Sequence, residues 1–99
     1  MTSYLDEMLA GSKPTLLEFY ATWNTLSNEM MPIVAQLIDI EGKHANIVQF
    51  EGDQNGALVE KYGITAYPSW LLFKEGKEVW RATGELTLAQ LRDAIAPYV

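Results

Sequence analysis

This 99-residue chain offers no thiol and a single imidazole as a nucleophile or metal ligand. The sequence has no cysteine and a single histidine, His44. Cysteine nucleophiles, disulfides and thiolate metal sites are therefore excluded, and a histidine-rich metal site is impossible. His44 stands in a predicted turn, where a solvated side chain is expected. The sequence accordingly predicts no metal site and no cofactor.

One short segment still carries groups that could do chemistry. Asn24 and Ser27 stand at the start of a long predicted helix. A serine nucleophile needs a neighbouring base, and the only histidine lies beyond the far end of that helix, so nucleophilic catalysis at Ser27 is not expected. We interpret Ser27 as an ordinary first-turn residue and Asn24 as the helix cap, which accepts hydrogen bonds from backbone amides. A polar contact to a bound chain or small molecule is the alternative for Asn24.

Hydrophobic periodicity predicts four helices that alternate with strands. The first helix begins at Ser3, the long second helix contains Pro32 and ends at Gly42, and the third is closed by Gly63. Asp53 or Asn55 is expected to cap the third helix. Thr87 and Gln90 predict a capping box on the fourth. The predicted strands are 15–20, 46–51, 69–73 and 78–82.

The order of these elements predicts a mixed sheet. A helical crossover joins the first two strands, which should therefore be parallel and connected with a right-handed turn. A short loop around Gly76 joins the last two strands into an antiparallel hairpin. The expected result is an α/β fold, one domain over residues 1–99, with helices on both faces of the sheet.

Composition and charge limit the classes of partner. Hydrophobic residues make up 48% of the chain and the net charge is -6, which is typical of a globular protein and disfavours nucleic acid or an anionic membrane as partner. The first residues lack the pattern of a secretory signal, and no apolar run is long enough to span a membrane. A cytoplasmic protein with a protein or peptide partner is expected, and its oligomeric state stays open.

Several segments, taken in order, resemble thioredoxins and protein disulfide isomerases. They are Leu17–Trp23, Asp53–Asn55, Tyr62–Ile64, Tyr67–Ser69 and Phe73–Lys77, followed by Gly84, with Pro32 where the family kinks its long helix. The resemblance covers about residues 13–96. It implies a thioredoxin fold in which the usual N-terminal strand is missing, because the residues before 15 are predicted to be helical. The sheet would then have four strands, with 46–51 at its edge.

The active-site motif of that family is Trp-Cys-x-x-Cys, and the matching segment here is Trp23-Asn24-Thr25-Leu26-Ser27. Disulfide exchange needs one thiolate to attack sulfur and a second thiol to release the product. The resemblance therefore implies a redox-inactive protein that is not an oxidoreductase. Glu18 matches the family's buried acid, which serves the second thiol. Because the chain has no thiols, we interpret Glu18 as a relic carboxylate that lies near Gln49 and is either hydrogen-bonded or in contact with a buried water. If it is isolated in a buried site, its pKa should be raised.

Binding is the function that the resemblance implies. In the family an extended polypeptide lies against a loop with a cis-proline, so the Tyr67–Pro68 bond should be cis, and the groove here would comprise Trp23, Asn24, Thr25, Leu26, Tyr67 and Pro68. Two alternatives remain: an assembly protein that docks through its sheet edge, and an oxidoreductase whose cysteines have been replaced. Trp70 is expected in the core and Trp80 against the last helix.

Overall fold

The apolar runs of the sequence form one mixed sheet. The computed structural model describes residues 3–99, and its strands lie in the order β2-β1-β3-β4. The strands are β1 (Thr15–Tyr20), β2 (Asn46–Glu51), β3 (Ser69–Lys74) and β4 (Lys77–Thr83). The helices are α1 (Tyr4–Ala10), α2 (Thr25–Glu41), α3 (Gly56–Lys61) and α4 (Leu88–Ile95), with short 3₁₀ turns η1 (Gly52–Gln54) and η2 (Ala96–Tyr98).

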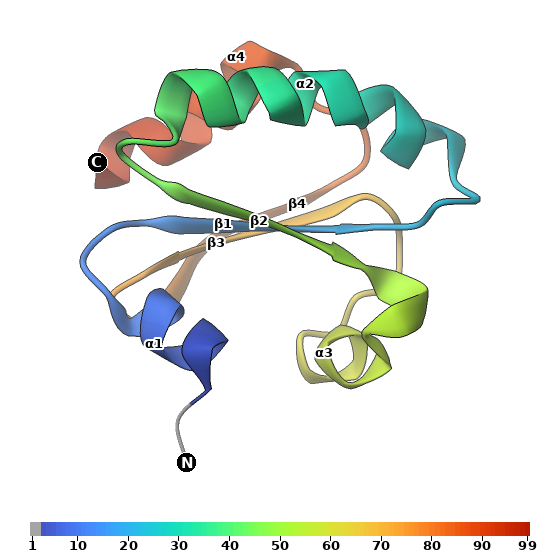
Figure 1. Ribbon diagram of the computed structural model, residues 1–99, viewed down its shortest axis with the longest axis horizontal. Coiled ribbons are helices and arrows are strands. Elements are labelled where there is room, and N and C mark those ends of the chain that lie inside the picture. Colours follow the sequence, from blue (N-terminus) through green and yellow to red (C-terminus); the bar gives the residue numbers. More distant parts are fainter. Residues whose placement is uncertain (1–2) are drawn as a thin grey trace.

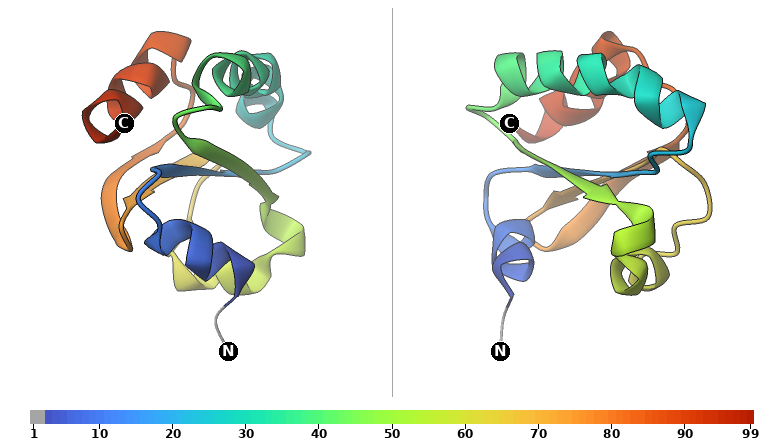
Figure 2. Two further views of the ribbon diagram at one scale, coloured as in Figure 1. Left: turned by 60° about the vertical axis from the view of Figure 1, so that its left-hand side comes forward. Right: turned by 45° about the vertical axis from the view of Figure 1, so that its right-hand side comes forward.

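The pairing of the strands confirms the predicted topology. β1 and β2 are parallel, in an unbroken register from Thr15↔Asn46 to Tyr20↔Glu51. β3 is antiparallel to both β1 and β4. β2 therefore lies at one edge of the sheet and β4 at the other, as the left view of Figure 2 shows.

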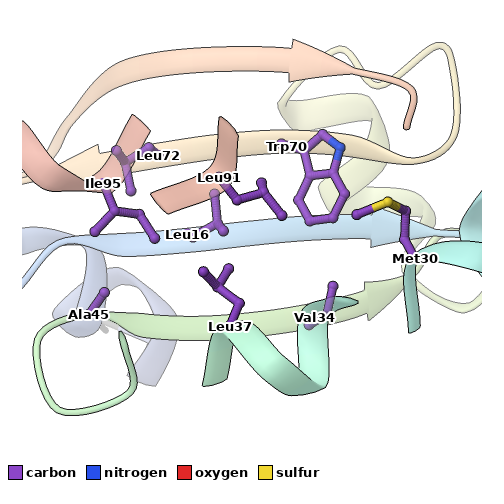
Figure 3. Close-up of a cluster of buried hydrophobic side chains, with 9 residues drawn as sticks. All are labelled: Leu16, Met30, Val34, Leu37, Ala45, Trp70, Leu72, Leu91 and Ile95. Atoms are coloured by element: carbon purple, nitrogen blue, oxygen red, sulfur yellow. The ribbon is translucent and has the colours of Figure 1, made fainter. Parts of the chain in front are cut away.

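Helices cover the two faces of the sheet in pairs. α2 and α4 lie on one face, and α1 and α3 on the other (Figure 1). Because successive strand residues point to opposite faces, β1 supplies Leu16 to the core under α2 and α4, and Leu17 and Phe19 to the core over α1 and α3. Trp70 belongs to the first of these cores, as expected (Figure 3).

Helix ends follow the local rules except at α3. Ser3 caps α1, and Thr87 with Gln90 forms the predicted capping box on α4. Asn55 occupies the N-cap position of α3, one of the two expected there, but its side chain makes no capping bond to the helix. Its amide instead donates to the carbonyl of Glu51 (2.7 Å), a contact that the local sequence pattern does not reveal.

No helix within residues 3–99 is both long and apolar enough to cross a bilayer.

Candidate functional site

An amide side chain caps α2 in the segment that follows β1. Asn24 Oδ1 accepts a hydrogen bond from the backbone N–H of Ser27 (2.8 Å), and Asn24 N–H donates to the carbonyl of Ala21 (3.0 Å). The predicted role of Asn24 as the cap of α2 is confirmed. Its side-chain oxygen therefore pairs one of the amides that a helix leaves unpaired at its start.

Ser27 is more buried than its sequence position suggests. Its side chain is fully buried, and its hydroxyl oxygen accepts a hydrogen bond from the backbone N–H of Ala21 (3.2 Å). The interpretation of Ser27 as an ordinary first-turn residue is thus wrong: it ties the end of β1 to the first turn of α2. His44 is exposed beyond the other end of this helix, roughly 25 Å away along its axis, so Ser27 has no histidine to serve as its base.

Glu18 lies in the middle of the sheet and is 1% exposed. Its Oε1 accepts a hydrogen bond from the side-chain amide of Gln49 (2.8 Å), the residue directly opposite on β2. Its Oε2 has no hydrogen-bond partner among the described protein groups. Burial raises the pKa of Glu18 to about 7, although the bond from Gln49 acts to lower it. The expected proximity to Gln49 is confirmed, and the carboxyl group titrates near neutral pH.

Two aromatic side chains form the exposed part of the site. Trp23 is 65% exposed, and its ring meets that of half-buried Tyr67 edge to face at a centroid distance of 5.8 Å. Trp23 Nε1 donates to Asp53 Oδ2 (2.9 Å). Burial, with the nearby charges of Asp53 and Glu51, raises the pKa of the Tyr67 hydroxyl above its usual range. Trp23 is therefore fixed from two sides while its ring stays accessible.

The turn that follows β2 positions these aromatic rings. Glu51 accepts hydrogen bonds from the N–H groups of Asp53 and Gln54, which caps η1 and holds Asp53 beside Trp23. Gly52 leaves room for Tyr67, because a Cβ atom at residue 52 would lie 2.1 Å from the Tyr67 hydroxyl oxygen. Only glycine allows this close approach without a shift of the ring.

The loop before β3 completes the site. The Tyr67–Pro68 peptide bond is cis. Pro68 is buried, and its carbonyl accepts a hydrogen bond from Gly84 N–H (2.8 Å). Gly84 in turn accepts one at its carbonyl from Trp70 Nε1 (2.9 Å). These bonds anchor the loop to the core, so Tyr67 stands on a rigid base.

The structure brings together most of the predicted binding residues. Thr25 and Leu26 are exposed at the start of α2, next to Trp23 and the half-buried Asn24. Sequence reasoning missed Asp53 and Gly52 as parts of this surface. Asp53 was recognised in the family-like segment but interpreted as a helix cap, and its contact with Trp23 spans 30 positions, which no local pattern encodes.

Outside this site, Trp80 has a structural role. Trp80 packs at the border of the core under α4, as expected. Within residues 3–99, no three histidine, aspartate or glutamate side chains gather into a group that could hold a metal ion. The arrangement at the start of α2 offers exposed aromatic surface beside the carboxylate of Asp53.

The sequence of the chain matches one family model and several known proteins. The Thioredoxin family model matches residues 1–97. A thioredoxin-like protein of Synechocystis is 37% identical over 94 residues, which cover 94% of this chain and 90% of that protein. The chloroplastic thioredoxin Y of Oryza sativa is 34% identical over 90% of this chain, and the match spans about half (54%) of that relative.

Solved structures agree with the sequence relatives. A mutant thioredoxin from Halobacterium salinarum superposes with a TM-score of 0.84 at 30% identity, covering 95% of this chain and 81% of that one. The thioredoxin of Fasciola hepatica gives a TM-score of 0.87 at 26% identity, with 96% and 91% covered. The chain therefore belongs to the thioredoxin family, with asparagine and serine where the resemblance places the reactive cysteines.

Proposed function

We propose that this chain is a redox-inactive thioredoxin-like module that binds an extended polypeptide at the surface around Trp23 and Tyr67. The observation that supports this most strongly is the exposed, yet fixed, indole of Trp23. The hydrogen bond to Asp53 and the edge-to-face contact with Tyr67 hold the ring in one orientation while most of it stays exposed. An indole fixed in this way loses little side-chain entropy when it contacts a partner.

The neighbouring groups fit a polypeptide better than a small polar ligand. The edge-to-face pair of Trp23 and Tyr67 offers apolar area, and the exposed Thr25 and Leu26 extend it along the start of α2. The cavities found on the described surface, of about 270–450 Å³, are lined by other residues. An open aromatic surface of this kind suits a chain laid across it, whereas a small molecule favours an enclosed pocket.

The negative charge of the chain limits which peptides could bind at this surface. The chain carries a net charge of -6, and Asp53 and Glu51 lie beside the aromatic pair. Like charges repel at an interface. The segment bound at this surface is therefore neutral or basic, with an apolar or aromatic side chain for the Trp23–Tyr67 pair.

The test compares truncation of the two aromatic residues with truncation of a matched control. Peptides are selected on the immobilised chain from a random peptide library, and their dissociation constants are measured by calorimetry. Anchors of this type cost about 2 kcal/mol when truncated, or roughly a thirtyfold loss of affinity. Trp23→Ala and Tyr67→Ala should each weaken the selected peptides by that factor.

Tyr4→Ala is the control, because Tyr4 is an aromatic residue that is 79% exposed on α1. It should leave the affinity of the selected peptides unchanged. Peptides that bind both aromatic variants as tightly as the unaltered chain would exclude this surface as the binding site. Circular dichroism of each variant shows whether a loss of binding reflects a loss of fold.

A further inference from the structure

We propose that two copies of this chain associate through the free edge of β2, which joins their sheets into one antiparallel, eight-stranded sheet. This inference goes beyond the proposed peptide site, because it concerns a different part of the sheet. It starts from a difference between the two edges of the sheet.

The β4 edge carries the features with which proteins prevent edge-to-edge pairing. It presents the exposed charged residues Lys77, Glu78 and Arg81, and its register with β3 shifts between Leu72 and Phe73. Charged residues and irregularities of this kind blunt an exposed strand edge. The β4 edge is therefore protected against another strand.

The β2 edge lacks the register shift and all but one of the charged residues. Its six residues pair with β1 in an unbroken register and include no proline, lysine or arginine. Its one charged residue is Glu51, whose carboxylate already accepts two backbone hydrogen bonds from η1. An edge that is regular and nearly uncharged is a template for another strand.

The direction of the backbone groups on β2 follows from one hydrogen bond. Asn46 N–H donates to the carbonyl of Pro14 (2.8 Å), so Asn46 faces β1. Backbone groups alternate in direction along a strand, which places those of Val48 and Phe50 toward β1 as well. The N–H and C=O groups of Ile47, Gln49 and Glu51 consequently point away from the sheet and could pair with a further strand.

The side chains that line the hollow beside β2 are uncharged. Gln49 lies 3.6 Å from Met31 Sδ on α2, and a hollow of about 270 Å³ is lined by Ile38 and Gly42 of the same helix face together with Ile47 and Val48. Ile38 is 43% exposed there. In a chain with a net charge of -6, this strip lacks the charges that would repel a second, identical copy.

Two copies of β2 have complementary residues when they run antiparallel about a two-fold axis at Gln49. In that register Gln49 faces Gln49 of the second copy, Ile47 faces Glu51, and Val48 faces Phe50. The outward backbone groups would then pair with each other across the axis. Val48 opposite Phe50 is a β-branched–aromatic pair, which stabilises neighbouring strands, and no like charges stand directly opposite one another.

The experiment uses sedimentation equilibrium at physiological salt with two charge variants of Gln49, whose side chain is exposed although its amide also donates to Glu18. Circular dichroism of each variant checks that the loss of this contact leaves the fold intact. The unaltered chain should have twice the mass of one copy. Gln49→Lys and Gln49→Glu each place like charges opposite themselves, and should raise the dissociation constant of the dimer by about tenfold or more. An equimolar mixture of the two variants places opposite charges together and should restore the dimer.

Thr83→Lys on the β4 edge is the matched control, because Thr83 is also exposed on an edge strand, and it should leave the dimer intact. A monomeric unaltered chain at every soluble concentration would overturn the proposal. So would a dimer that persists in both Gln49 variants, or dissociation that the mixture does not reverse, because the latter would point to another register or to another protein's strand. Trp23→Ala should stay dimeric, which separates this inference from the peptide site.

Discussion

At the scale of single residues, the positions that correspond to the two thiols have become hydrogen-bond acceptors. Asn24 accepts from Ser27 N–H, and the Ser27 hydroxyl accepts from Ala21 N–H. Neither group can form a disulfide, because disulfide exchange takes place at sulfur. Glu18, which the resemblance matches with the family's buried acid, is a buried carboxyl group with one oxygen hydrogen-bonded to Gln49.

Glu18 should make the stability of the protein depend on pH. Its pKa is raised from 4.5 to about 7 in the folded chain. Between these values the unfolded chain has released the proton that the folded chain still holds, so raising the pH favours unfolding. The free energy of unfolding should fall by up to about 3 kcal/mol as pH rises from about 4.5 to about 7, and then level off.

Glu18→Gln removes this titration while keeping the shape of the side chain. The variant should be more stable than the unaltered chain at pH 8 by up to about 3 kcal/mol and nearly equal to it at pH 5, as measured by urea unfolding. Glu60→Gln on the exposed surface of α3 is the control and should change neither value. Equal stabilisation by Glu18→Gln at both pH values would show that Glu18 does not titrate in this range.

At the scale of elements, α2 depends on its first turn. The helix joins the two parallel strands, and its buried residues Met30, Val34 and Leu37 fill the core on that face of the sheet (Figure 3). Asn24 supplies its cap from outside the helix, and Ser27 binds its first turn to the end of β1. The asparagine thus takes part in forming the element that carries part of the proposed binding surface.

Removal of the cap should destabilise α2 measurably. Asn24→Ala leaves the backbone N–H of Ser27 without its side-chain acceptor, and should lower the free energy of unfolding by about 1 kcal/mol. Asn24→Asp keeps the acceptor and adds a negative charge at a helix start, where it is favoured, so its stability should match or exceed that of the unaltered chain. Urea unfolding at neutral pH measures both. Alanine and aspartate variants of equal stability would contradict the capping role.

At the scale of the whole molecule, the thioredoxin framework persists without its thiols. Sheet order, the covering helices and the loop at Pro68 are in place, and the start of α2 holds Asn24 and Ser27 one helical turn apart. Their positions are already joined by a hydrogen bond of 2.8 Å between side chain and backbone. The framework should therefore accept a disulfide at these two positions.

Restoring both cysteines tests that expectation. The unaltered chain has no thiol, and with dithiothreitol as reductant it should reduce a disulfide substrate no faster than the uncatalysed rate. Asn24→Cys combined with Ser27→Cys should lose both free thiols on mild oxidation without forming a larger species, as shown by thiol titration and mass spectrometry. Asn24→Cys alone is the control and can form only intermolecular disulfides. A double variant that cross-links between chains instead would show that the first turn of α2 has departed from the required geometry.

The sequence by itself determined the order of the elements, the strand directions, most helix caps and the absence of thiol chemistry. These features depend on short-range properties: apolar periodicity, capping residues such as Ser3 and Thr87, and residue types at fixed spacing. The family resemblance added the location of the aromatic surface at Trp23 and Tyr67. The element order and the helix caps could be derived from neighbouring positions in the chain, whereas the aromatic surface came from the resemblance alone.

Only the tertiary structure decided how that surface is held and which buried groups are paired. Trp23 meets Asp53 across 30 positions. The resemblance predicts that Glu18 lies near Gln49, but the hydrogen bond between them, across 31 positions, is established by the packing. The burial of Ser27 likewise depends on how α2 docks on β1. Such contacts follow from the packing of distant elements, so no local pattern specifies their geometry. The same packing removes water from the carboxyl group of Glu18 and thereby raises its pKa to about 7.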